Sequence, residues 1–153
     1  MLTQLRSRTN KYYEMESLQG LGLALLGLER RGEARAAFSE MLELALAATR
    51  THSVYVAGAL SGIALAAEPD AADRAARLCG AVAQLNSDAG VVMSAYSDLN
   101  ELRTHFELQL VAVLGEEAWE QARAVGSMMT LEEAIVVAQS LSGHSERAVA
   151  VES

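Results

Sequence analysis

The side chains best suited to metal binding in this sequence are three histidines and one cysteine. His52, His105 and His144 lie far apart, and none has another His or Cys three or four residues away. Zinc ligands on one helix need such spacing, because it places them on the same face. Glu101 and His105 are four residues apart and could hold a weakly bound ion, but a solvated pair is the simpler interpretation. We therefore expect no metal site.

Three glycines, Gly20, Gly22 and Gly27, match part of a dinucleotide-binding loop. That loop needs a Gly where this chain has Leu25, and it must follow a strand. Here the glycines lie in a helical pattern, so we interpret them as packing residues. Lys11 is the single Lys, and no Gly-Lys-Ser or Gly-Lys-Thr occurs, so we expect neither ATP binding nor any other cofactor.

Paired carboxylates occur at Glu116-Glu117 and Glu132-Glu133. Both pairs fall in the first turns of predicted helices, where the helix dipole favours acidic groups whatever their chemistry. Ser142-Gly143-His144 is typical of a helix end, and no Gly-x-Ser-x-Gly motif occurs. The sequence therefore predicts a protein that is not an enzyme.

Helices are the elements that must position these residues. The chain has 28 Ala, 22 Leu and one Pro, a composition that favours helix over strand. Apolar residues recur at helical spacing between turn signals, which predicts an all-α fold of six to seven helices. A capping box of Thr130 and Glu133 begins the last of them. The predicted helices are 13–28, 33–50, 53–67, 70–86, 97–114, 116–124 and 130–143.

We expect residues 1–147 to form one helical domain. It contains hairpins at 13–50 and 53–86 and C-terminal helices at 97–142, and a tail at 148–153 follows. Residues 91–96 are expected to form either a short helical turn or an irregular segment. Cys79 cannot form an internal disulfide and lies in an apolar stretch, so we expect it to be a core residue facing the wedge between the hairpins.

Charge and hydropathy restrict the classes of partner that this chain is expected to bind. The net charge is −8, and residues 53–153 carry 5 basic and 14 acidic groups, a balance that repels phosphate backbones and anionic lipids. The first residues lack the apolar stretch of a signal peptide, and the longest uncharged run, 51–67, contains polar residues. We expect a cytoplasmic protein, or a piece of a longer one, that binds neither nucleic acid nor membrane directly.

The first hairpin carries the most specific motif. The residues Leu18, Leu21, Gly22, Ala24 and Leu25 are followed by Ala34, Phe38, Met41 and Leu42. This pattern resembles a tetratricopeptide repeat, in which antiparallel helices cross at small residues and stack on the next pair. We expect Gly22 and Ala34 at the crossing, with Leu18, Leu21, Phe38 and Leu42 filling the wedge to the second hairpin. Gly62 corresponds to Gly22 at an offset of 40 residues.

A second resemblance covers about residues 50–142. The segments 73–81 (DRAARLCGA), 114–119 (LGEEAW) and 126–134 are similar to the C-terminal end of large bacterial signalling ATPases, including LuxR-type and AfsR-type transcriptional regulators. The resemblance implies irregular tetratricopeptide-like helices that serve as a sensor or interaction arm. The ATPase core and DNA-binding region of such a regulator lie outside this chain.

Two functions remain open at this point. The first is a non-catalytic protein-interaction or scaffold arm of a bacterial regulator, and the alternative is a sensor that binds an apolar small molecule between the hairpins. In tetratricopeptide arrays the first helix of each pair lines the concave face. The resemblance therefore places a partner-binding stripe at Glu16, Gln19, Leu23 and Leu26, continued by Val56, Ala59, Ile63 and Ala66. Because this stripe is mostly apolar, we expect it to be covered by the C-terminal helices, by a second copy of the chain or by the missing part of the regulator. The C-terminal helices would cover part of it, and we expect a symmetric dimer to cover the remainder.

Overall fold

The computed structural model describes residues 2–48, 53–88 and 97–152, and side chains within 11–48, 54–88 and 101–142. These residues form seven α-helices, one short 3-10 helix and no strand, which confirms the all-α prediction. The elements are α1 (Leu2–Gly27), α2 (Arg31–Ala47), α3 (Ser53–Leu65), η1 (Pro69–Ala71), α4 (Ala72–Asp88), α5 (Ser97–Leu114), α6 (Glu116–Ser127) and α7 (Leu131–Glu152).

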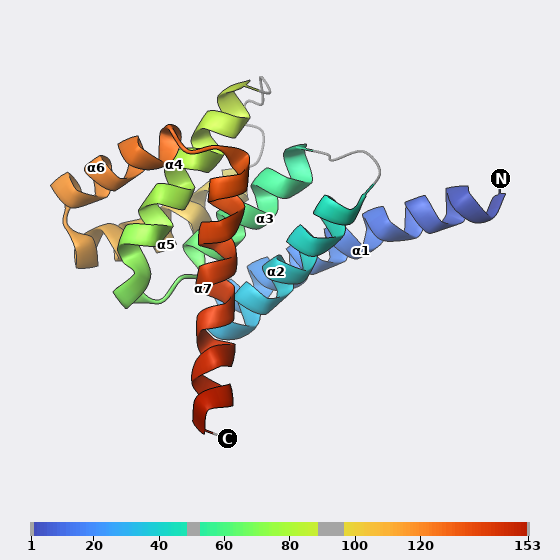
Figure 1. Ribbon diagram of the computed structural model, residues 1–153, viewed down its shortest axis with the longest axis horizontal. Coiled ribbons are helices and arrows are strands. Elements are labelled where there is room, and N and C mark those ends of the chain that lie inside the picture. Colours follow the sequence, from blue (N-terminus) through green and yellow to red (C-terminus); the bar gives the residue numbers. More distant parts are fainter. Residues whose placement is uncertain (1, 49–52, 89–96, 153) are drawn as a thin grey trace.

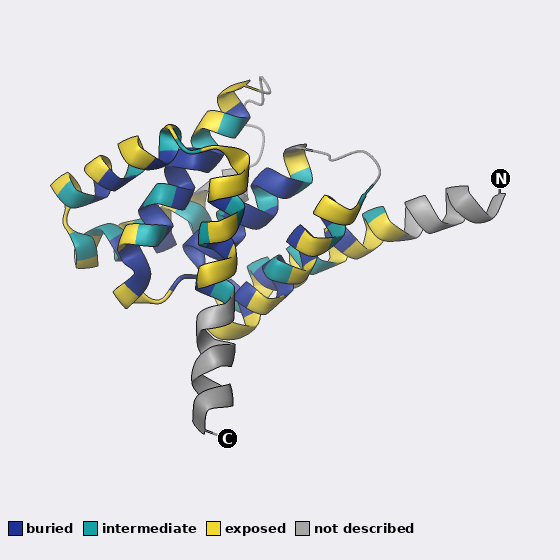
Figure 2. Cartoon of the chain, viewed as in Figure 1, coloured by how far each residue is buried: buried dark blue, intermediate teal, exposed yellow. Residues whose placement is uncertain are grey.

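The helices surround α3. Helices α1 and α2 form a hairpin at one edge, and α3 and α4 lie beside it (Figure 1). Helix α6 packs along α4, and α7 crosses α2, α3 and α4. Most described residues of α3 are buried, whereas exposed residues recur along residues 11–27 of α1 (Figure 2). The C-terminal helices therefore fold back over the two hairpins.

Phe38 of α2 joins the two hairpins. Its ring, 1% exposed, lies between Gly22 of α1 and Gly62 of α3. A Cβ added to Gly22 would lie 2.6 Å from Cζ of Phe38, and a Cβ on Gly62 would overlap the same ring. The two glycines thus let both helix backbones come close to one aromatic ring. Leu21, which we expected in this wedge, is instead half exposed.

The closest helix crossing joins α4 and α6. A Cβ added to Gly80 would overlap the backbone carbonyl of Arg123, and a Cβ added to Gly126 would overlap that of Arg77. The pairs 80 with 123 and 77 with 126 show that the two helices run antiparallel. Ala76 and Ala122, each one turn from a glycine, are also buried. Small residues therefore allow the two backbones to touch.

Two arginines of α2 donate hydrogen bonds to backbone carbonyl groups at the C-terminal end of α3. The Arg35 guanidinium, 4% exposed, donates to the carbonyl oxygen of Ala66 at 2.7 Å and to Glu68 at 3.0 Å. Arg31 donates to the carbonyl oxygen of Ala67 at 2.9 Å. Cations stabilise a helix C-terminus, where carbonyl groups lack partners. The buried Arg35 guanidinium therefore has hydrogen-bond partners at the end of α3.

Several predicted helix limits need correction, and α6, for example, ends at Ser127 rather than at residue 124. Helix α1 begins at Leu2 rather than near residue 13, because the preceding residues contain no Gly or Pro to stop it. The turn into α2 is made by Glu29, with φ of 60°, while Gly32 lies inside α2. Helix α7 continues to Glu152, beyond the predicted end near Gly143 and through the predicted tail. Residues 91–96 lie outside the described residues.

The capping box of α7 is confirmed. The Thr130 amide donates to Glu133 at 3.0 Å, and the Glu133 amide donates to the Thr130 hydroxyl at 3.2 Å. The hydrogen bond from the Thr130 backbone amide lowers the pKa of the Glu133 carboxyl, and the Thr130 side chain lowers it further. Across the described residues, every helix is too short or too polar to span a membrane.

Candidate interaction surfaces

The five predicted partner-binding residues divide into two groups. Glu16 is exposed, and Gln19 and Leu23 are partly exposed on the same side of α1. Leu26 and Ile63 are 0% exposed and belong to the hydrophobic core. The structure therefore brings three of the five to an accessible surface and corrects the placement of the other two.

The continuation of the stripe on α3 is also corrected. Residues Val56, Ala59, Ile63 and Ala66 are all buried, because α2, α4 and α7 pack around this helix. The accessible side of α3 carries Val54, Tyr55, Gly58 and Ser61 instead. The apolar stripe is thus covered by the chain's own helices, including α7, and a dimer is not needed to cover it.

We define the inner face as Tyr12, Glu16, Gln19 and Leu23 of α1 with Tyr55 and Gly58 of α3. The Tyr55 hydroxyl donates to Glu16 at 3.2 Å, and the rings of Tyr12 and Tyr55 lie 5.9 Å apart at an angle of 38°. Burial raises the pKa of Tyr55, and the nearby Glu16 charge raises it further. This surface combines aromatic area, an aliphatic side chain and a carboxylate.

Sequence reasoning missed the two tyrosines. Tyr12 precedes Glu16 by four residues, so helical spacing alone places both on one side of α1. Tyr55 gives no comparable signal, because its position beside Glu16 depends on how α3 rotates against α1. That rotation is set by Phe38 between Gly22 and Gly62, a tertiary contact.

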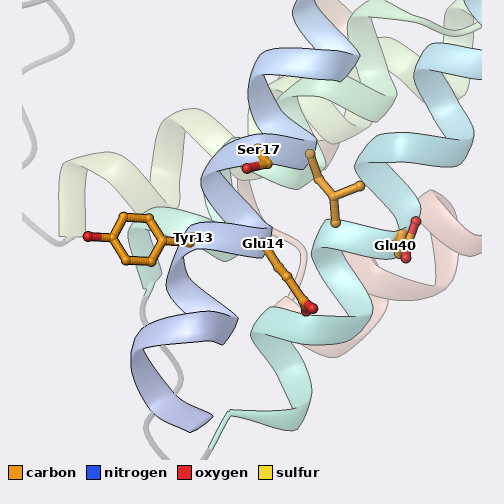
Figure 3. Close-up of a pocket in the computed structure, with 5 residues that line it drawn as sticks. Tyr13, Glu14, Ser17 and Glu40 are labelled. Atoms are coloured by element: carbon orange, nitrogen blue, oxygen red, sulfur yellow. The ribbon is translucent and has the colours of Figure 1, made fainter. Parts of the chain in front are cut away.

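The solvent-facing side of α1, next to the inner face and opposite the buried Met15 and Gly22, forms a second surface. We define the outer face as Tyr13, Ser17, Gly20, Leu21, Ala24, Gly27 and Leu28. A shallow depression of about 530 Å³ lies at one end of it, lined by Tyr13, Glu14, Ser17, Leu18 and Glu40. Figure 3 shows Glu14 on α1 and Glu40 on α2 at this depression, with Tyr13 pointing away from it.

A third surface is the groove between α2 and α7, with a volume of about 410 Å³. The hydroxyl groups of Ser39 and Ser142 form a hydrogen bond across it, and Ser142 also donates to the carbonyl oxygen of Ala138 at 3.0 Å. The buried Arg35 lines the groove while its guanidinium holds the end of α3. These groups serve contacts between helices.

The residues considered above as candidates for metal or nucleotide binding, His105 and three glycines, all lie within helices. His105 of α5 lies 3.2 Å from the Gln109 amide nitrogen and edge-on against Phe106. Gly20, Gly22 and Gly27 all lie within α1, but only Gly22 packs against a neighbour, the Phe38 ring. Gly20 and Gly27 are exposed, and among the described residues no atom lies within 4 Å of a Cβ added to either, which corrects their interpretation as packing residues. Among the described residues, no three His, Cys, Asp or Glu side chains cluster in a way that could hold a metal ion.

Cys79 is a buried thiol of α4, and burial raises its pKa to about 12. We expect native protein to react with a thiol reagent at pH 8 only through rare opening, and unfolded protein to react at once. Because the folded pKa is raised, stability should fall as pH rises from about 9 to about 12. Cys79→Ala should cost about 1 kcal/mol and abolish the part of this pH dependence that comes from the thiol. Rapid labelling of the native protein would contradict the placement.

Comparisons with protein-family models, with curated proteins and with solved structures found no match for this chain.

Proposed function

We propose that this chain is a non-catalytic protein-interaction arm of a bacterial signalling or transcriptional regulator, working in the cytoplasm. A protein partner binds the inner face, with Glu16, Gln19 and Leu23 making contacts from α1 and Tyr55 from α3. The chain itself makes no direct contact with nucleic acid or membrane.

The observation that carries the proposal is the composition and support of the inner face. Tyrosine supplies large contact area at low entropic cost, and an aliphatic residue beside a carboxylate suits a mixed apolar and polar partner. The Tyr55 hydroxyl bond to Glu16 holds groups from two helices in fixed positions. Beneath them, Met41 lies 3.6 Å from where a Cβ on Gly58 would be, so the face rests on the core.

The side chains that could take part in chemistry have roles within the fold, which supports a non-catalytic function. Arg31 and Arg35 hold the end of α3, Glu133 caps α7, and Cys79 is a protonated core residue. Each of these groups stabilises helix packing. The acidic charge of the chain favours a partner surface that carries basic groups near Glu16.

The sensor alternative requires apolar space between the hairpins. Phe38 occupies that position and contacts both neighbouring helices. The two cavities described lie elsewhere, one between α1 and α2 and the other between α2 and α7. The structure therefore favours the interaction arm over the sensor.

Site-specific photo-crosslinking tests the proposal. A photoreactive residue replaces Glu16 in the full chain, expressed in its native host, and a matched variant carries it at Glu117, which is exposed on α6. We expect a discrete protein adduct from position 16 and none from position 117. Adducts from both positions, or from neither, would contradict binding at the inner face.

A further inference from the structure

The geometry points to the outer face of α1 as a self-association surface, where a second copy of this chain packs its own α1 in antiparallel orientation. This inference is independent of the proposed function, which concerns the inner face. It rests on exposure, residue spacing, and the charges at the two ends of the outer face.

The outer face is apolar and unpartnered. Tyr13, Leu21 and Leu28 are 65%, 51% and 67% exposed. A Cβ added to Gly20 or Gly27 would meet no atom within 4 Å in the described part of the chain. From residue 17 to residue 28 the helix carries no charged residue. A soluble protein seldom leaves such a continuous apolar surface in water.

The spacing of its residues suits a second helix. Tyr13, Ser17, Gly20, Ala24 and Gly27 are separated alternately by four and three residues, the repeat of helices that pack along their length. An antiparallel pair aligned at the small residues places Ser17 against Gly27 of the second copy, and Gly20 against Ala24 of the second copy. Leu21 then lies beside the two-fold axis and packs on its equivalent.

The molecule already contains a contact of this type. Helices α4 and α6 run antiparallel with Gly80 and Gly126 at backbone contact and with alanines one turn away. The outer face of α1 presents the same kind of residues, and among the described residues no atom lies within 4 Å of a Cβ added to Gly20 or Gly27. A symmetric arrangement uses one surface twice, as two-fold dimers do.

The charges at the two ends of the outer face are complementary in this orientation. Glu14 and Glu40, beside the depression, have no basic partner among the described side chains. At the other end lies Arg30, whose side chain is 55% exposed although it pairs with Glu33. Antiparallel packing brings Arg30 of each copy toward Glu14 of the other, twice by symmetry.

The buried interface area determines how strongly the two copies are expected to associate. Two helices packed over about 24 Å bury roughly 500 Å² per copy, close to the lower limit for a specific interface. The net charge of −8 on each copy opposes association at low salt. We therefore expect a weak dimer that dissociates at low micromolar concentration and strengthens as salt increases.

Sedimentation equilibrium over micromolar to millimolar concentration tests the inference. The parent should pass from monomer to dimer, whereas Leu21→Glu should stay monomeric. The matched control is Leu108→Glu on α5, where the parent side chain is 61% exposed, and it should dimerise like the parent. Circular dichroism checks that both variants keep their helical content. A parent that stays monomeric throughout, a different stoichiometry, or equal dimerisation of Leu21→Glu would overturn the inference.

Disulfide trapping tests the orientation. In a Cys79→Ala background, Leu21→Cys should form an intermolecular disulfide on mild oxidation, because the two copies of residue 21 lie at the axis. Leu108→Cys should remain reduced under the same conditions. If both cysteines crosslink at similar rates, the dimer does not pack through α1.

Discussion

Gly126→Ala is expected to destabilise the protein by about 3 kcal/mol, near the upper end for overpacking. The added methyl group would overlap the backbone carbonyl of Arg77, and backbone cannot rotate away as a side chain can. Helices α4 and α6 must therefore separate and lose contacts along their whole crossing. Gly80→Ala should have a similar effect through Arg123. The measurement is urea denaturation followed by circular dichroism.

Gly20→Ala is the matched control. It places the same methyl group on a helical glycine with open space around it, so only the gain in helix propensity remains. We expect it to raise stability by about 0.5 to 1 kcal/mol at concentrations where the protein is monomeric. Equal effects of Gly20→Ala and Gly126→Ala would show that the α4–α6 crossing is looser than the structure has it.

Phe38→Ala is expected to cost about 3 to 5 kcal/mol, the range for removing a buried aromatic ring. The ring fills the space between Gly22 and Gly62, and neither glycine has a side chain that could move into the cavity. The hairpins would therefore lose their main shared contact. Thermal and urea unfolding of the variant measure the loss.

A double-mutant cycle separates this packing from a general loss of stability. In the parent, Gly62→Ala should destabilise because its methyl group overlaps the Phe38 ring. In the Phe38→Ala background the same change fills empty space and should be neutral or stabilising. Additive effects in the two backgrounds would argue against direct contact of residues 38 and 62.

Local signals explain which parts of the fold were predictable. The capping box at Thr130 and the turn at Pro69 act within one turn of helix, so the starts of the helices that follow them were predicted closely. The backbone contact of Gly80 and Gly126 depends on two segments far apart in sequence, and no local pattern marks it. The burial of Arg35 has the same origin, because its partners lie at the end of α3.

The candidate binding surface was likewise predictable from local sequence only in part. Glu16, Gln19 and Leu23 share one side of α1, and helical spacing alone predicts this. Transferring the repeat pattern to α3 failed for Ile63, because α2, α4 and α7 all pack around α3 and Ile63 lies in the core. The sequence pattern of a repeat describes how neighbouring pairs stack, whereas a returning C-terminal helix is a tertiary event.

Cysteine footprinting tests most directly whether the inner face is a binding surface. Glu16→Cys is labelled with a membrane-permeant thiol reagent in living cells and in dilute purified protein, with Glu117→Cys as the exposed control on α6. Residue 16 should react rapidly in the purified chain and slowly in cells, while residue 117 should react rapidly in both. Equal labelling of residue 16 in cells and in purified protein would contradict binding at the inner face.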